Sequence, residues 1–352
     1  LTYGVVTGNP GAADVITGVT SGATCVLTSG TADFTGIIWE GQCQNQEFSV
    51  AGTVVTFAGS TASTTAYKHL TTAAGASFRD HADVLSNALR YDATKGAALN
   101  NTVAGSTTVT ISEANVRISN LQITESGGLG RALGSGGGTT AVFVDNCILE
   151  GGVISTSGVN GTILVGSNNT FRNCVIIQRG SGADHIIATQ TNSPFFYNCT
   201  IVAPTDLGAA PTSIFTSGAS GTVTAQNCAL FAGDSSKAIK AGSATFNFTT
   251  CVSDIAGTSG VTAVSFDSEY YDAGNTTTDL RLSMMSAQID TGTTDAVNAA
   301  TDIKGTARPV EAGYDIGCWE STFNAASKLA NPYLRSRRPR AHDAVSRRKG
   351  RR

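Results

Sequence analysis

An Asn-Cys pair preceded by alternating apolar residues recurs along the middle of this 352-residue chain. Asparagine, or threonine in the last copy, stands at positions 120, 146, 173, 198, 227 and 250, which is a period of about 26 residues. The residue after it is Leu121, Cys147, Cys174, Cys199, Cys228 or Cys251. The residue two positions before it is Ile118, Val144, Phe171, Phe196, Ala225 or Phe248. Such columns indicate a solenoid, in which equivalent positions of successive turns stack on one another.

The apolar residues around each asparagine alternate with polar ones, which is the pattern of strands with one buried face. The asparagine interrupts this alternation, as a one-residue bend between two strands does, because asparagine tolerates the left-handed conformation. A third apolar segment lies upstream in each repeat, at 109–111, 163–165, 186–187, 214–215 and 238–239. The sequence therefore predicts an all-β fold, a right-handed parallel β-helix with three short strands in each coil. A β-sandwich is the alternative, but it gives no reason for identical columns.

Five of the eight cysteines occupy the inward column that follows the asparagines. Neighbouring positions on parallel strands lie about 4.8 Å apart, whereas the Cβ atoms of a disulfide lie about 3.8 Å apart. These five are therefore predicted to be buried free thiols, and a straight ladder cannot converge on a metal ion. Cys25 and Cys43 lie outside the column and could form a disulfide, which would leave Cys318 unpaired. No metal site and no cofactor are predicted.

Composition separates an acidic body from a basic tail. Charged residues make up 14% of the chain and hydrophobic residues 41%, which excludes an intrinsically disordered protein or a long coiled coil. The tail, residues 335–352, has one acid, Asp343, and nine bases, which are Arg335, Arg337, Arg338, Arg340, Arg347, Arg348, Lys349, Arg351 and Arg352. We expect these nine to anchor the protein to an acidic protein surface. Nucleic acid is an alternative partner that the acidic body would repel, and a mere solubility tag or a crystal contact is another explanation.

A set of short motifs follows the repeats. They are Asp279-Leu280-Arg281-Leu282, the run 287–292, Asp302-Ile303-Lys304-Gly305, Arg308-Pro309 and the run 314–320. Together they resemble the C-terminal closing segment of right-handed β-helix proteins from bacteria and their phages, although Cys318 replaces the alanine of that pattern. Trp39-Glu40-Gly41 and residues 67–76 resemble the first coils of β-helix proteins encoded among phage structural genes. The resemblance spans roughly residues 36–320, and it implies the β-helix fold, which is shared by lyases, hydrolases, adhesins and virion proteins.

These features divide the chain into five parts. We expect an N-terminal segment at 1–35, and first coils with a cap at 36–105. Regular coils follow at 106–266, the closing segment at 267–320, and an extended basic tail at 321–352. The cap is predicted to contain a short helix at 80–91, with Asp80 as its N-cap and Leu85 and Leu89 on its apolar face.

The outward positions of the first strand of each coil contain no carboxylate pair on neighbouring coils, as glycoside hydrolysis would need. They hold Thr110, Leu164, His185 and Lys240 with many Ser and Thr residues. Arg179, Asp184 and His185 form the one local constellation, which we interpret as a solvated turn. His69 and His81 have no partner that the sequence identifies. No catalytic residue is therefore predicted.

The sequence thus favours a non-enzymatic structural component of a virus particle, a phage decoration, spike or fibre protein anchored by its basic tail. Its expected partners are acidic virion proteins such as the capsid, with a glycan on the rod as a further candidate and no membrane span. The alternative is an extracellular or cell-surface protein that binds or depolymerises polysaccharide, or an adhesin. Such a protein would use a groove along the coils with Thr, Asn and aromatic side chains such as Tyr197.

Overall fold

A computed structural model of the protein describes residues 38–322 and two short strands before them. Gaps in this range fall at 60–62, 81–87, 129, 137–138, 152–160, 181–184, 190–192, 206–210, 218–220, 273–277, 296–297, 299 and 311. The two short strands, β1 (Val15–Thr17) and β2 (Thr24–Val26), pair antiparallel with each other. The basic tail, His81 and Asp184 lie outside the described residues.

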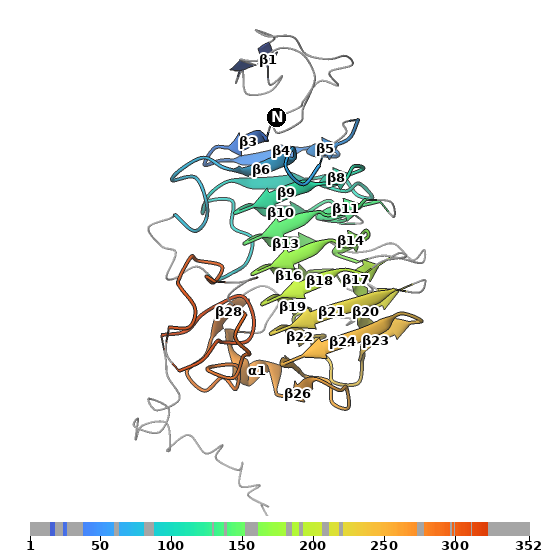
Figure 1. Ribbon diagram of the computed structural model, residues 1–352, viewed down its shortest axis with the longest axis vertical. Coiled ribbons are helices and arrows are strands. Elements are labelled where there is room, and N and C mark those ends of the chain that lie inside the picture. The colour runs from blue at the N-terminus through green and yellow to red at the C-terminus, as the bar shows by residue number, and fades with distance from the viewer. Residues whose placement is uncertain are drawn as a thin grey trace, which may run out of the picture.

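The chain winds through three parallel sheets whose strands stack along the long axis of the molecule (Figure 1). The eight-stranded sheet contains, in spatial order, β3 (Trp39–Cys43), β6 (Lys68–Thr72), β9 (Val116–Ser119), β12 (Phe143–Asp145), β15 (Thr170–Arg172), β18 (Phe195–Tyr197), β21 (Thr222–Gln226) and β24 (Thr245–Thr249). The nine-stranded sheet contains β4 (Glu47–Val50), β7 (Ala98–Asn101), β10 (Gln122–Glu125), β13 (Ile148–Gly151), β16 (Val175–Gln178), β19 (Thr200–Val202), β22 (Ala229–Phe231), β25 (Cys251–Ser253) and β26 (Val261–Ala263). The seven-stranded sheet contains β5 (Val55–Phe57), β8 (Val109–Ile111), β11 (Leu133–Ser135), β14 (Ile163–Val165), β17 (His185–Thr189), β20 (Ser213–Ser217) and β23 (Ala238–Gly242). The predicted all-β parallel β-helix is confirmed.

The asparagine bends join the eight-stranded sheet to the nine-stranded sheet. Asn120, Asn146, Asn173, Asn198, Asn227 and Thr250 all have positive φ angles, between 51° and 63°. Asparagine adopts this left-handed conformation more readily than most residues, so one residue is enough to redirect the chain. The backbone of each asparagine bend also bonds to the next coil, as in the 2.9 Å hydrogen bond from Asn146 N to Arg172 O. The predicted one-residue bend is confirmed.

The interior of the helix is filled by the predicted inward columns. The cysteines at 147, 174, 199, 228 and 251 are buried free thiols, and burial raises the pKa of the first four well above its usual value. Phe171 and Phe196 stack at 5.1 Å between ring centroids, and neither is exposed to solvent. Cys43 is also a buried free thiol, so the suggested disulfide between Cys25 and Cys43 is wrong.

A second apolar core lies outside the helix, where residues 266–320 cover the nine-stranded sheet (Figure 1). It begins with α1 (Phe266–Glu269) and the antiparallel pair β27 (Tyr270–Asp272) and β28 (Asp279–Leu282). Outward side chains of the sheet pack here against apolar side chains of the C-terminal segment. The sheet contributes Ile148, Val175, Ile177, Val202 and Phe231, and the segment contributes Leu280, Leu282, Ile289, Ile303, Ile316 and Trp319. We call residues 266–320 the cover.

The cover is also tied to the bends by hydrogen bonds. Asn173 Nδ2 donates to Thr301 O at 2.7 Å, and Asn227 Nδ2 donates to Thr293 O at 2.6 Å. Arg308 Nη1 donates to Asn198 Oδ1 at 3.2 Å. The cover is therefore hydrogen-bonded to three coils of the helix.

The helix predicted at 80–91 is not present at its C-terminal end. Leu89 is buried, but its φ of 56° is left-handed, which is incompatible with a right-handed helix. Residues 81–87 lie outside the described residues. Among the described residues, no helix is long and apolar enough to cross a membrane.

Candidate functional site

The outer face of the eight-stranded sheet is open to solvent and is where polar side chains gather. Strand register places the outward residues in two columns that run along the molecule. The first column holds Glu40, His69, Arg117, Phe143, Thr170, Phe195, Thr224 and Asn247, and the second holds Gln42, Thr71, Ser119, Asp145, Arg172, Tyr197, Gln226 and Thr249. All of these residues except Thr71 keep part of their surface exposed.

Three successive coils at the N-terminal end of this face bring a carboxylate, an imidazole and a hydroxyl together. Glu40 on β3 places Oε2 3.3 Å from Nδ1 of His69 on β6. The other ring nitrogen, Nε2, lies 2.8 Å from Oγ of Ser119 on β9. The side chains of Glu40 and His69 are 41% and 22% exposed, so a solute can reach the group. The order carboxylate, imidazole, hydroxyl is the arrangement of a general-base relay.

The surroundings of His69 favour the neutral ring. Partial burial lowers the pKa of His69 below 6.5, and the charge of Arg117 lowers it further, while Glu40 and Asp145 oppose the shift. A carboxylate on Nδ1 selects the tautomer with its proton on that nitrogen. Nε2 is then left with a free electron pair, which faces Ser119. His69 is therefore placed to accept a proton near neutral pH.

Next to His69 a cationic and aromatic row continues along the sheet. The Arg117 guanidinium lies 3.8 Å from the Tyr67 ring centroid, and its Nη1 donates to Tyr67 OH at 3.1 Å. Phe143 lies between two arginines, with the guanidinium carbons of Arg117 and Arg172 at 5.5 and 5.7 Å from its ring centroid.

Arg172 is held by a bidentate pair with Asp145, at 2.6 and 2.7 Å. The aromatic row ends with Phe195 and Tyr197, whose rings are nearly parallel at 6.2 Å. The face thus offers flat apolar surfaces and guanidinium groups in alternation, and one of these groups, that of Arg172, is already paired with Asp145.

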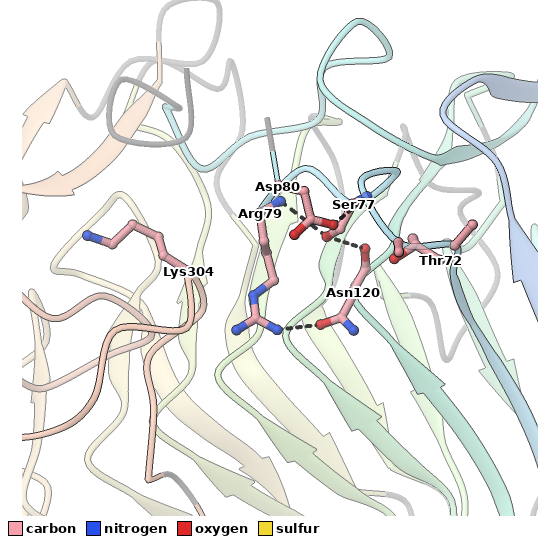
Figure 2. Close-up of a pocket in the computed structure, with 8 residues that line it drawn as sticks. Thr72, Ser77, Arg79, Asp80, Asn120 and Lys304 are labelled. Atoms are coloured by element: carbon pink, nitrogen blue, oxygen red, sulfur yellow. Dashed lines mark hydrogen bonds between the residues drawn. The ribbon is translucent and has the colours of Figure 1, made fainter. Parts of the chain in front are cut away.

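A polar cavity of about 300 Å³ opens at the end of β6 and at the Asn120 bend that follows β9 (Figure 2). Thr72 and Asn120, which line it, immediately follow Thr71 and Ser119 in the chain. Arg79 Nη1 donates to Asn120 Oδ1 at 2.6 Å, and Ser77 Oγ donates to Asn120 O at 3.1 Å. Figure 2 shows the Arg79 side chain reaching across the cavity toward the Asn120 amide. Partial burial lowers the pKa of Arg79 from its usual value.

The spacing of carboxylates on this face decides between two kinds of glycan cleavage. Glu40 and Asp145 stand on β3 and β12, three strand spacings apart. At about 4.8 Å for each spacing, their backbones are roughly 14 Å apart. Glycoside hydrolysis requires two carboxyl groups roughly 5–10 Å apart. The face is therefore not arranged for that reaction, but it does provide one base, His69, and two arginines, Arg117 and Arg172.

The residues singled out from the sequence occupy other places. Arg179 forms an ion pair with Glu150 at 2.8 Å, and His185 Nδ1 lies 2.7 Å from Ser213 Oγ on the seven-stranded sheet. Asp184 and the nine tail residues from Arg335 to Arg352 lie outside the described residues, so their predicted roles stay predictions. Thr110 and Leu164 are partly exposed and Lys240 is exposed, as expected for outward positions.

The sequence analysis missed Glu40, His69 and Ser119 as a group. The signal was present in the register. Continuing the column of Arg117 back by one coil places His69 beside it, and one coil further places Glu40 beside His69, while Ser119 stands two residues after Arg117 in the neighbouring column. Among the described residues, no group of three or more His, Cys, Asp and Glu side chains could hold a metal ion.

No protein-family model matches this chain, and no curated protein sequence matches it. A similar solved structure is described as the crystal structure of pectate lyase Pel9A. The two chains are 13% identical, with a TM-score of 0.44 over 84% of this chain and 91% of that chain. At this level of identity the likeness concerns the β-helix fold alone.

The prediction that the protein is not an enzyme is not supported, because the β-helix fold also occurs in enzymes. The solved structure that resembles it is that of an enzyme. The prediction was drawn from the first strands, which form the seven-stranded sheet, whereas the base, the carboxylate and the arginines lie on the eight-stranded sheet. The comparisons also give no support to a place among phage structural proteins.

Proposed function

We propose that this protein is an enzyme that binds an acidic polysaccharide along the outer face of the eight-stranded sheet and cleaves it by β-elimination. The observation that carries the proposal is that His69 and Arg117 are register partners on adjacent coils and therefore lie side by side. The lowered pKa of His69 favours its neutral form. Elimination from a uronic acid needs a base for the proton next to the carboxyl group and a positive charge to neutralise that carboxylate. These two groups stand side by side on an accessible face.

The rest of the face supplies binding. Aromatic rings offer flat apolar surfaces for sugar rings, and guanidinium groups pair with carboxylates in a planar fork. Phe143, Phe195 and Tyr197 alternate with Arg117 and Arg172 along the coils. A chain with a carboxylate on each sugar matches this alternation better than a neutral one does.

The proposed step balances without a cofactor. His69 Nε2 takes the proton from C5 of the uronic acid, and the electron pair of that C–H bond forms the C4–C5 double bond. The C4–O bond breaks, and its electrons stay on the glycosidic oxygen. The Tyr67 hydroxyl, which Arg117 holds at 3.1 Å, is placed to give that oxygen a proton. Arg117 neutralises the carboxylate, which acidifies the C5 proton.

The test is a panel of polyuronates and neutral polysaccharides, followed by the ultraviolet absorbance of the unsaturated product. We expect cleavage of at least one polyuronate, a loss of at least about 100-fold in kcat for His69→Ala, and a raised KM for Arg172→Ala. The matched control is Tyr271→Ala, because Tyr271 is an exposed aromatic residue beside an arginine, Arg281, but it lies on the cover. Cleavage of neutral chains alone, or full activity in His69→Ala, would contradict the proposal.

The predicted place in a virus particle, with an extracellular place as its alternative, stays a proposal drawn from the sequence. The same is true of anchoring by residues 335–352 to acidic virion proteins. An enzyme that degrades surface polysaccharide suits either location, so neither depends on the reaction proposed above.

A further inference from the structure

Ser119 has a position that elimination does not require. Its Oγ lies 2.8 Å from His69 Nε2, on the side of the ring opposite Glu40. Each of the three residues comes from a different coil, so the parallel ladder fixes their separations. A base that only removes a proton from a sugar needs no hydroxyl hydrogen-bonded to it. A base that activates a nucleophile does.

We propose that Ser119 is the nucleophile of a Glu40–His69–Ser119 relay that hydrolyses O-acyl esters on the polysaccharide bound to this face. The identity of the polysaccharide as acidic rests on the proposed function. The ester chemistry rests only on the geometry around Ser119, so each can be tested without the other.

Glu40 sets the direction in which the proton moves. It accepts the Nδ1 proton of His69, which orients the ring and stabilises the imidazolium that forms when Nε2 takes a proton. Ser119 has a second neighbour, Thr71, whose Oγ1 is 2.9 Å from Ser119 Oγ. Thr71 competes with His69 for the serine proton, so replacing its hydroxyl by a methyl group directs that proton to His69.

Asn120 supplies a donor for the negative oxygen of the tetrahedral intermediate. Its Nδ2 lies 3.5 Å from Ser119 Oγ. The amide cannot turn over freely, because Arg79 Nη1 donates to its oxygen at 2.6 Å (Figure 2). The amino group therefore faces Ser119 before any substrate arrives, which is the preorganisation that an oxyanion site requires.

The cavity beside Asn120 gives the acyl group a place. It measures about 300 Å³ and is lined by Thr72, Arg79 and Asn120. The sugar would lie on the open sheet face, toward Arg117 and Phe143, and the acyl group would enter the cavity. A space of this size accepts a small acyl group such as acetyl.

The proposed hydrolysis has two steps, acylation of Ser119 and hydrolysis of the acyl-serine, and each step balances. Ser119 Oγ attacks the ester carbonyl carbon, its proton passes to His69 Nε2, and the sugar hydroxyl leaves with that proton as the ester C–O bond breaks. Water then attacks the acyl-serine and gives a proton to His69, which returns it to Ser119 Oγ. The products are the free sugar hydroxyl and a carboxylic acid.

The first experiment needs no variant and no polysaccharide. The native protein is treated with a fluorophosphonate, which forms a covalent bond with activated serines, and the labelled peptide is identified by mass spectrometry. We expect label at Ser119. Ser213 is the matched control within the same molecule, because it is also 2.7 Å from a histidine nitrogen but lies on the seven-stranded sheet and is buried. Label spread over several serines, or no label at Ser119, would overturn the proposal.

The second experiment separates the two reactions. Acetate release from O-acetylated polygalacturonate is compared with elimination on the deacetylated polymer. Ser119→Ala should lower acetate release by roughly 1,000-fold or more and leave elimination within about twofold. Thr71→Val should release acetate at least as fast as the native protein, and Asn120→Ala should lower the rate about 100-fold. Unchanged acetate release in Ser119→Ala or in His69→Ala overturns the relay, whereas a native protein that releases acetate but performs no elimination contradicts only the proposed function.

Discussion

The eight-stranded and nine-stranded sheets of this protein have the same coil period and the same inward columns, yet their outer faces differ completely. On the nine-stranded sheet the outward residues from β13 onward are mostly apolar, as at Val175 and Phe231, and the cover buries them. On the eight-stranded sheet the outward residues are charged, aromatic or hydroxylic, and they remain accessible. The inner face of a coil makes the fold, and the outer face alone decides whether a sheet is packed against another segment or left for a ligand.

The largest expected effect is on the free energy of unfolding, when one phenylalanine on each outer face is replaced by alanine. Phe231 stacks on Phe266 at 4.5 Å and meets Tyr270 at 5.7 Å, so Phe231→Ala should lower the free energy of unfolding by about 3–5 kcal/mol. Phe195 is partly exposed on the open face, so Phe195→Ala should cost less than about 1 kcal/mol while weakening polysaccharide binding. Denaturant unfolding and affinity electrophoresis measure the two quantities. Equal destabilisation would mean that the open face is packed as well.

A second difference between the faces is their dependence on pH. Burial raises the pKa of Asp315 in the cover to about 7, although Asp290 N and Ser321 N donate to its oxygens and Arg308 opposes the shift. A raised pKa means that the folded state holds the proton more tightly than the unfolded state does. Stability should therefore be greatest below about pH 4 and fall by a few kcal/mol as pH rises to about 7.

Asp315→Asn tests this dependence. The variant loses one acceptor and should be less stable at low pH, but its stability should change less between pH 4 and pH 7. Burial also raises the pKa of the neighbouring Glu320, so part of the slope will remain. Melting temperatures over this range provide the measurement, and a slope identical to that of the native protein would show that Asp315 does not titrate in the folded state.

The inner and outer faces also differ in how much of their structure could be predicted from the sequence. The inward columns could be predicted because each coil repeats the same kind of residue, as at Cys147 and Phe171. The cluster at Glu40, His69 and Ser119 could not, because its members come from three coils and each alone is an ordinary outward polar residue. The segment 73–97 also lengthens the coil between β6 and β9, which hides the period that would have aligned His69 with Arg117.

On the open face, pH acts on activity instead of stability. His69 must be neutral to accept a proton, so activity should fall as pH drops through its lowered pKa, below 6.5. The charges that face it are Glu40 and Asp145, which raise this pKa, and Arg117, which lowers it. Glu40→Gln should therefore move the acid limb of the pH profile of kcat/KM to lower pH, by less than about one unit for a partly exposed pair. An upward shift would mean that another group is the base.

The smallest effect on stability and on cleavage is expected from removing residues 335–352. The coils and the cover end before this tail, so its deletion should leave the melting temperature and polysaccharide cleavage unchanged. Attachment to a particle or to an acidic protein surface should be lost, and in the native protein it should weaken between 0.1 M and 1 M salt, where screening is strong. Co-sedimentation with the partner measures attachment, and normal attachment of the truncated protein would place the anchor elsewhere.

The hydrogen bonds from the cover to the asparagine bends have a consequence for biosynthesis. Thr293, Thr301 and Arg308 meet bends on three different coils, so they can dock only after those coils have stacked. These residues also follow the coils in the chain and leave the ribosome after them. For that interval the apolar face of the nine-stranded sheet is complete but bare, which makes the nascent chain a substrate for chaperones and exposes it to aggregation when translation stalls before residue 293.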